Sequence, residues 1–168
     1  TLIESANKKI TDSIRYAQRI QDAIIPSEEE MVDSFTEHFV LFQPRDIVSG
    51  DFYWSWKTNG MSQFAVVDCT GHGVPGAIMS VVGFAMLEQT TKVKQINEPA
   101  KILTEMNAGI VGWLKQNEGN VLHETGKMWK SRDGMDMSMI SLDKENRKIV
   151  FSGAKNSLFY TENGKIKE

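Results

Sequence analysis

The first 25 residues carry small or apolar side chains at the spacing of a helix. One series recurs every seven positions, and a second series lies three positions after the first. This is the a/d heptad pattern of a coiled coil, and Pro26 ends it. The helix either packs on its own domain or forms a parallel coiled coil that relays a signal from an upstream domain. The first series is Ile3, Ile10, Ala17 and Ile24, and the second is Ala6, Ser13 and Ile20.

Beyond the linker of residues 1–25, the pattern of residues 26–168 is that of a mixed domain. Ser27 and the three glutamates after it predict the cap and first turn of a short helix. The stretch "HFVLFQP" predicts a buried strand that ends at Pro44. Residues 51–57 and 61–68 predict a hairpin, because the Asn-Gly pair between them is a strong turn signal.

Two helices and three strands are predicted in the second half of the chain. Residues 74–90 predict a helix, and a second helix follows Asn97 as its cap. Residues 117–134 are polar and without period, which predicts a loop, and the strands "MDMSMISLD", "KIVFSG" and "SLFYTENGKIKE" come after it. The order of elements predicts an α+β fold in which helices cover an antiparallel sheet. The apolar stripe expected on the first of these helices is Ile78, Val81, Val82, Ala85 and Met86.

Composition narrows the class of protein. The formal charge of -3 predicts no broad basic face for nucleic acid or an anionic membrane. The single cysteine, Cys69, excludes an intrachain disulfide and a cysteine-based zinc site, and favours a reducing, cytoplasmic compartment. No apolar run is long enough to insert into a membrane. The chain begins on Thr1 and is therefore expected to be a fragment.

Two aspartates stand at matching ends of the predicted hairpin. Asp51 opens its first strand and Asp68 closes its second, so the two carboxylates are expected side by side. Adjacent strands are only about 4.8 Å apart, and two such carboxylates repel unless a cation lies between them. Oxygen ligands favour a hard ion such as Mg²⁺ or Mn²⁺. The alternative is that each aspartate is an ordinary residue of a turn.

The residues after Asp68 fit an anion or metal site. Gly71 and Gly73 allow the backbone to turn tightly and to approach an ion or phosphate, and a helix N-terminus follows. A cysteine phosphatase is a poor alternative, because no arginine lies in the six residues after Cys69. A P-loop is excluded, because no Lys-Ser or Lys-Thr pair follows the glycines.

Five blocks in this order resemble the SpoIIE-like branch of the metal-dependent type 2C serine/threonine phosphatases. They are "SIRYAQRIQDAIIP", "QPRDIVSGDFYW", "VVDCTGHGVPGAIMS", "DGMDMSMISLD" and "FSGAKNSLFYTENGKI". The resemblance implies an α-β-β-α layered sandwich with a helical linker to a sensor domain. It also implies hydrolysis of phosphoserine or phosphothreonine on a bacterial signalling protein, with two Mn²⁺ or Mg²⁺ ions that activate a water.

The resemblance also implies roles for individual residues. Asp51 matches a terminal metal ligand, Asp68 the bridging ligand, and Cys69 a ligand through its backbone carbonyl. Asp136 or Asp133 lies near where relatives place another acidic ligand, or else is a strand-end turn residue. His72 is either a proton donor to the leaving group or a structural loop residue. Arg45 either holds phosphate or is a solvated turn residue.

The family pattern continues beyond the "GKI" strand with further acidic ligands that this chain lacks. The chain is therefore expected to be truncated at its C-terminus and to have little phosphatase activity alone, whereas the full protein is active. The expected partners are a phosphoprotein substrate, an upstream sensor domain and a second copy bound through residues 1–25. The alternative function is a non-catalytic signalling or dimerisation module that keeps the phosphatase fold.

Overall fold

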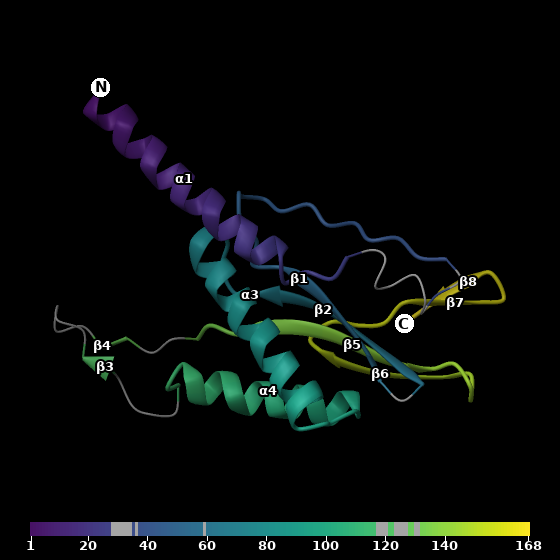
Figure 1. The fold of residues 1–168 in the computed structure, drawn as a ribbon. Coiled ribbons are helices and arrows are strands. Elements are labelled where there is room, and N and C mark those ends of the chain that lie inside the picture. The colour runs from purple at the N-terminus through teal and green to yellow at the C-terminus, as the bar shows by residue number, and fades with distance from the viewer. Residues whose placement is uncertain (28–34, 36, 59, 117–120, 123–127, 130–131) are drawn as a thin grey trace.

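The computed structural model describes residues 1–27, 35, 37–58, 60–116, 121–122, 128–129 and 132–168. Helix α1 spans Leu2–Asp22, and Thr1 and Glu4 close a capping box at its start. The helix predicted for the first 25 residues is therefore present, and most of it projects away from the domain (Figure 1). The short helix predicted at Ser27 falls on residues 28–34, which lie outside the described residues.

A four-stranded antiparallel sheet with strand order β1-β2-β5-β6 forms the centre of the fold. Its strands are β1 (Phe52–Thr58), β2 (Met61–Cys69), β5 (Met135–Asp143) and β6 (Lys148–Ala154). The predicted hairpin and the first two predicted late strands are confirmed. The third late segment folds as a separate pair, β7 (Tyr160–Glu162) with β8 (Lys165–Lys167). Within the stretch predicted as a loop, β3 (Val121–Leu122) pairs with β4 (Met128–Trp129).

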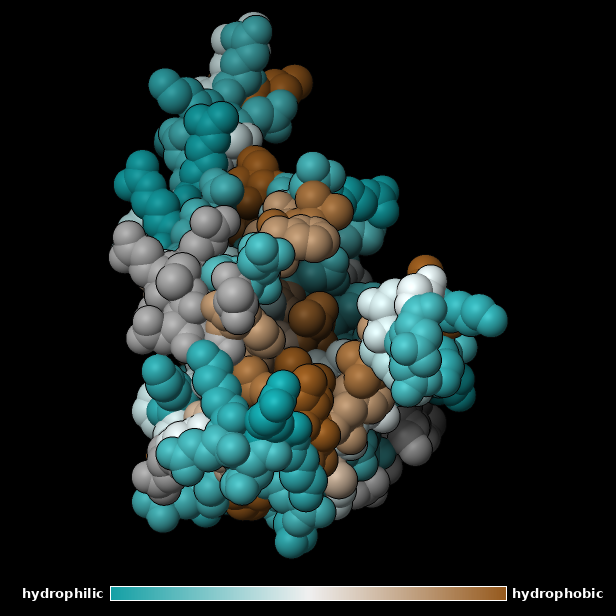
Figure 2. All heavy atoms as spheres, turned by 90° about the vertical axis from the view of Figure 1, so that its right-hand side faces the viewer, coloured by the Kyte–Doolittle hydropathy of each residue, from teal (hydrophilic) through white to brown (hydrophobic). Residues whose placement is uncertain are grey.

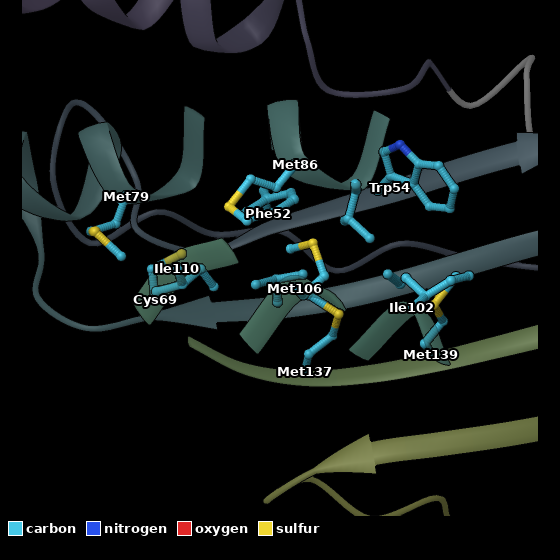
Figure 3. Close-up of a cluster of buried hydrophobic side chains, with 13 residues drawn as sticks. Phe52, Trp54, Cys69, Met79, Met86, Ile102, Met106, Ile110, Met137 and Met139 are labelled. Carbon is cyan, nitrogen blue, oxygen red and sulfur yellow. The ribbon is translucent and has the colours of Figure 1, made fainter. Parts of the chain in front are cut away.

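Helices cover one face of this sheet. Helix α3 (Gly73–Glu88) continues into a π-helix, η1 (Gln89–Val93), and is followed by α4 (Pro99–Trp113), as Figure 1 shows. The core lies between these helices and the sheet (Figure 3). Alternate residues of β1, β2 and β5 enter it, as a pleated strand requires. The buried side chains include Phe52, Trp54, Val67, Cys69, Leu87, Ile102, Met106, Met137 and Met139.

The buried side of α3 differs from the predicted stripe. Ile78 is 60% exposed and Val81 is 40% exposed, whereas Gly76, Ala77 and Met79 are buried. The helix is apolar on all sides, so its periodicity does not single out one face. Small residues at its start decide the packing, because they let the helix approach the sheet closely.

The other face of the sheet carries apolar side chains, and no helix among the described residues covers them. Val66 and Ile149 are 62% and 59% exposed there. A cavity of about 810 Å³ lies between this face and residues 35 and 37–43. Figure 2 shows apolar surface gathered in a hollow between hydrophilic rims. This arrangement of helices on one face and an open second face is that of an incomplete α-β-β-α sandwich.

The strand predicted for residues 38–44 is wrong. The described residues of this segment have no regular structure, and Phe39 and Leu41 are 89% and 76% exposed. The aromatic ring of Phe42 packs on Tyr53 with centroids 5.8 Å apart, on the open face of the sheet. The segment therefore contacts this face through Phe42 and does not pair with a sheet edge. No helix among the described residues is long and apolar enough to cross a membrane.

Candidate active site

Three aspartates lie in one row across three neighbouring strands. In the β1–β2 register Phe52 pairs with Val67, so Asp51, one residue earlier, stands beside Asp68. In the β2–β5 register Asp68 pairs with Asp136. Residues directly opposite in antiparallel strands point to the same face, with Cβ atoms about 5 Å apart. The row therefore occupies one end of the open face.

Asp51 and Asp68 stand side by side at the ends of β1 and β2 and interact electrostatically. Partial burial, the negative charge of Asp68 and a hydrogen bond to its carboxylate raise the pKa of Asp51 above its ordinary value of 3.8. Two carboxylates held this close are destabilised when both are ionised, and a bound cation removes that cost. The donor set is oxygen only and open to solvent, which fits a hard divalent ion.

Asp136 has a different partner. The ammonium Nζ of Lys155 lies 3.0 Å from Asp136 Oδ1. Among the residues that the structure describes, no group of three or more histidine, cysteine, aspartate or glutamate side chains is arranged to hold a metal ion. The structure thus brings Asp51 and Asp68 together as two candidate ligands and places Asp136 beside them in an ion pair.

The loop after Asp68 turns on glycines, as the sequence predicts. Gly71 and Gly73 have φ angles of 91° and 60°, in the left-handed region that favours glycine. Helix α3 starts at Gly73, and its N-cap residue His72 makes no side-chain cap hydrogen bond. The first N–H groups of α3 therefore have no side-chain acceptor at the cap and can donate to an anion.

Two further glycines bring the site segments into backbone contact. A Cβ atom on Gly76 would lie 2.5 Å from the carbonyl oxygen of Gly71 and 3.0 Å from Cα of Gly50. A Cβ atom on Gly50 would lie 2.7 Å from the same carbonyl oxygen. The segment before Asp51, the glycine loop and the first turn of α3 are therefore one packed unit. Sequence reasoning missed Gly50 and Gly76, although each is part of a quoted motif.

His72 is held by a residue that the sequence analysis did not single out. Its Nδ1 atom lies 2.9 Å from Oδ2 of Asp46, and the two side chains are 64% and 40% exposed. With Nδ1 engaged, Nε2 is the ring nitrogen that remains to face another molecule. This geometry suits a proton donor and equally suits a residue that stabilises the loop.

The thiol of Cys69 points into the core, among Met79 and Ile110 (Figure 3). Burial, with smaller contributions from the charges of Asp51 and Asp68, raises its pKa to about 12. The side chain is therefore neutral at physiological pH and is neither a nucleophile nor a thiolate ligand. Only the backbone carbonyl is left for the predicted role.

Two predicted residues remain, Asp133 and Arg45. Asp133 precedes β5, and its backbone carbonyl accepts a hydrogen bond of 2.6 Å from Gln116 Nε2. Arg45 is exposed in the bend before Ser49. Two hydrogen bonds join the segment of Asp133 to the glycine loop. Thr70 N donates to the backbone Gly134 O at 2.9 Å, and Gly134 N donates to the side-chain Oγ1 of Thr70 at 3.0 Å.

The end of α1 is attached directly behind the site. Gln21 is 4% exposed, and its Oε1 accepts from Ser49 N at 2.8 Å. Its Nε2 donates to Ser49 O at 2.6 Å and to Ser80 Oγ at 2.7 Å. Ser49 Oγ in turn accepts from Asp51 N at 3.0 Å. Gln21 is a polar residue outside the heptad series, and the heptad pattern therefore did not predict its contact with Ser49.

A comparison with solved structures agrees with the fold and the site described above. No family model and no curated protein matches the chain. Among solved structures the chain is similar to the SiaA-PP2C domain of Pseudomonas aeruginosa, with 35% sequence identity and a TM-score of 0.75. The match covers 92% of this chain and 57% of that one. The predicted fold class is confirmed: the chain has the fold of a PP2C-like phosphatase domain over the part that it spans.

Proposed function

We propose that this chain belongs to the SpoIIE-like branch of the PP2C phosphatases and carries part of the active site of a metal-dependent serine/threonine phosphatase. The observation that carries the proposal is the Asp51–Asp68 pair, which stands at the end of two paired strands. The similarity to a PP2C domain supports the reaction class. The substrate would be a phosphoserine or phosphothreonine of a bacterial signalling protein.

The residues present fit Mn²⁺ or Mg²⁺ through Asp51, Asp68 and the carbonyl of Cys69. Asp136, or less directly Asp133, would add a carboxylate from β5 or the segment before it. Bound divalent ions would supply charge neutralisation at the phosphoryl oxygens and an activated water. The N–H groups after Gly71 and Gly73 would donate to phosphoryl oxygens, with Arg45 as a further cation near the entrance. His72, oriented by Asp46, would protonate the leaving oxygen.

This chain alone is expected to turn over slowly. Its described residues bring only two carboxylates together, and a metal held by few protein ligands binds weakly. The test is Mn²⁺-dependent hydrolysis of p-nitrophenyl phosphate and of a phosphoserine peptide by the chain and by Asp68→Asn. Turnover that Asp68→Asn leaves unchanged would refute the proposal.

The alternative, a non-catalytic dimerisation module, draws on α1. Ile3, Ile10 and Ile20 are 73%, 60% and 50% exposed, whereas Gln21 on another side of the helix is buried. The part of the heptad series from Ile3 to Ile20 is therefore exposed and available to a second copy, and an upstream sensor domain is expected beyond it. Analytical ultracentrifugation of the chain with and without residues 1–25 tests this module. A dimer lost on deletion, together with no Mn²⁺ binding by calorimetry, would favour it over the enzyme.

A further inference from the structure

Lys155 is held at the row of aspartates by the fold itself. It follows β6 directly, forms an isolated bridge with Met137 of β5, and places its ammonium 3.0 Å from Asp136. Asp136 in turn pairs with Asp68 across β2 and β5. Only Asp136 therefore stands between the ammonium of Lys155 and the Asp51–Asp68 pair in this row.

The backbone at Lys155 is strained. Its φ angle is 63°, a left-handed conformation that costs a lysine free energy and persists only where the surroundings impose it. The turn beside it is tight, because a Cβ atom on Gly153 would lie 2.1 Å from the carbonyl oxygen of Asn156. The chain thus doubles back immediately after β6 and delivers Lys155 to this position.

The ammonium is also accessible. The side chain of Lys155 is 80% exposed and that of Asp136 is 35% exposed. A hollow of about 320 Å³ lies beside the pair and is lined by Asp136, Lys155 and residues of α4, whereas Asp51 and Asp68 line the larger cavity on the open face. An exposed ion pair adds little to stability, so it does not by itself account for the strained backbone at Lys155. A ligand bound at the row of aspartates would account for a strained residue that holds its ammonium there.

We propose that Lys155 binds the phosphoryl group of the substrate, with Asp136 as the residue that positions its ammonium. The inference rests on the proposed phosphatase function. An ammonium has three N–H donors, so one can remain on Asp136 while the others donate to non-bridging phosphoryl oxygens. Lysine is suited to this role because it acts on phosphate as a compact point charge. Lys155 lies in the block "FSGAKNSLFYTENGKI", but no pattern in the sequence predicts a role for it.

The test measures phosphate binding directly, without relying on turnover. The 168-residue chain is titrated with inorganic phosphate in the presence of Mg²⁺, followed by ³¹P NMR, and Mg²⁺ affinity is measured separately by calorimetry. Lys155→Met is compared with Lys148→Met, which lies at the far end of β6. Loss of one charge-assisted contact to phosphate predicts about tenfold weaker phosphate binding for Lys155→Met and no change for Lys148→Met. Lys155→Arg should recover part of the affinity, and all variants should keep their Mg²⁺ affinity.

The outcomes separate this inference from the proposed function. Equal phosphate affinity in Lys155→Met and the wild type overturns the role of Lys155, and so does a parallel loss of Mg²⁺ affinity. If phosphate binding depends on Lys155 but Asp68→Asn leaves the slow hydrolysis of p-nitrophenyl phosphate unchanged, the inference stands and the phosphatase function fails. If the wild type hydrolyses p-nitrophenyl phosphate and Lys155→Met does so equally well, only the role of Lys155 fails. A wild type that binds no phosphate overturns it as well.

Discussion

The side-chain amide of Gln21 bonds to both backbone groups of Ser49, accepting from its N–H at 2.8 Å and donating to its carbonyl at 2.6 Å. These two hydrogen bonds imitate the pairing with a neighbouring strand, and both are buried. Because Ser49 lies two residues before Asp51, the end of α1 sets the backbone from which a candidate metal ligand projects. A rotation of α1 would have to break these bonds or carry the peptide with it.

Replacing Gln21 by alanine should destabilise the domain. The change leaves the N–H and carbonyl of Ser49 without their buried partner, and each unsatisfied group costs about 1–3 kcal/mol. We expect a loss of about 2–4 kcal/mol in the free energy of unfolding, measured by urea denaturation. Gln18→Ala, one turn earlier on α1, is the matched control and should change stability by no more than about 0.5 kcal/mol. Equal effects of the two variants would mean that the amide does not anchor the helix.

Two helical glycines should respond in opposite directions to alanine. Gly76 meets the backbone of Gly71 and Gly50, so an added methyl group forces the glycine loop and α3 apart. We expect Gly76→Ala to cost about 1–3 kcal/mol or more. Gly112 in α4 has nothing within 4 Å of an added Cβ, and Gly112→Ala should stabilise the chain by up to about 1 kcal/mol through helix propensity. Thermal melts of both variants measure this, and a neutral Gly76→Ala would contradict the packed unit.

Cys69 should be unreactive in the folded chain. Its pKa of about 12 keeps the thiol protonated at pH 8, and its side chain is buried. Ellman's reagent should therefore react with the native protein only on the timescale of unfolding, and completely within seconds in denaturant. Fast labelling of the native protein would show that the thiol is more open than the structure has it.

Patterns in the sequence predicted where helices and strands occur better than they predicted which side of each element is buried. The Asn-Gly turn gave the β1–β2 register, and that register places Asp51 beside Asp68. The same reasoning had no register for β5, so Asp136 could not be separated from Asp133 until the pairing of Asp68 with Asp136 was known. Ile78 was assigned to the core because α3 is apolar all round, and "HFVLFQP" was read as a strand because its aromatic residues cover a sheet face. Contacts between distant segments, such as Gln21 with Ser49, leave no periodic signal.

The stability of the metal-free chain should fall as pH rises above about 4. The pKa of Asp51 in the folded state lies above its ordinary value of 3.8, so the folded chain holds a proton that the unfolded chain releases first. The stabilisation is complete below the unfolded pKa and is lost as pH rises through the folded pKa. Thermal melts in EDTA between pH 4 and pH 7 measure the trend, and Asp51→Asn should flatten it and melt higher at pH 7. Asp12→Asn on exposed α1 is the control and should keep the wild-type slope.

Divalent metal should reverse that loss at neutral pH. An ion that binds only the folded chain stabilises it by about 1.4 kcal/mol at ten times its dissociation constant, which raises Tm by about 3–5 °C for a chain of this size. We expect this rise with Mn²⁺ at pH 7 in the wild type and in Asp12→Asn, and its absence in Asp68→Asn. At pH 4 the rise should be smaller than at pH 7, because protonation of Asp51, which its raised pKa favours, competes with metal binding. A rise in Tm that is equal at both pH values, or that survives Asp68→Asn, would place the bound ion away from the Asp51–Asp68 pair.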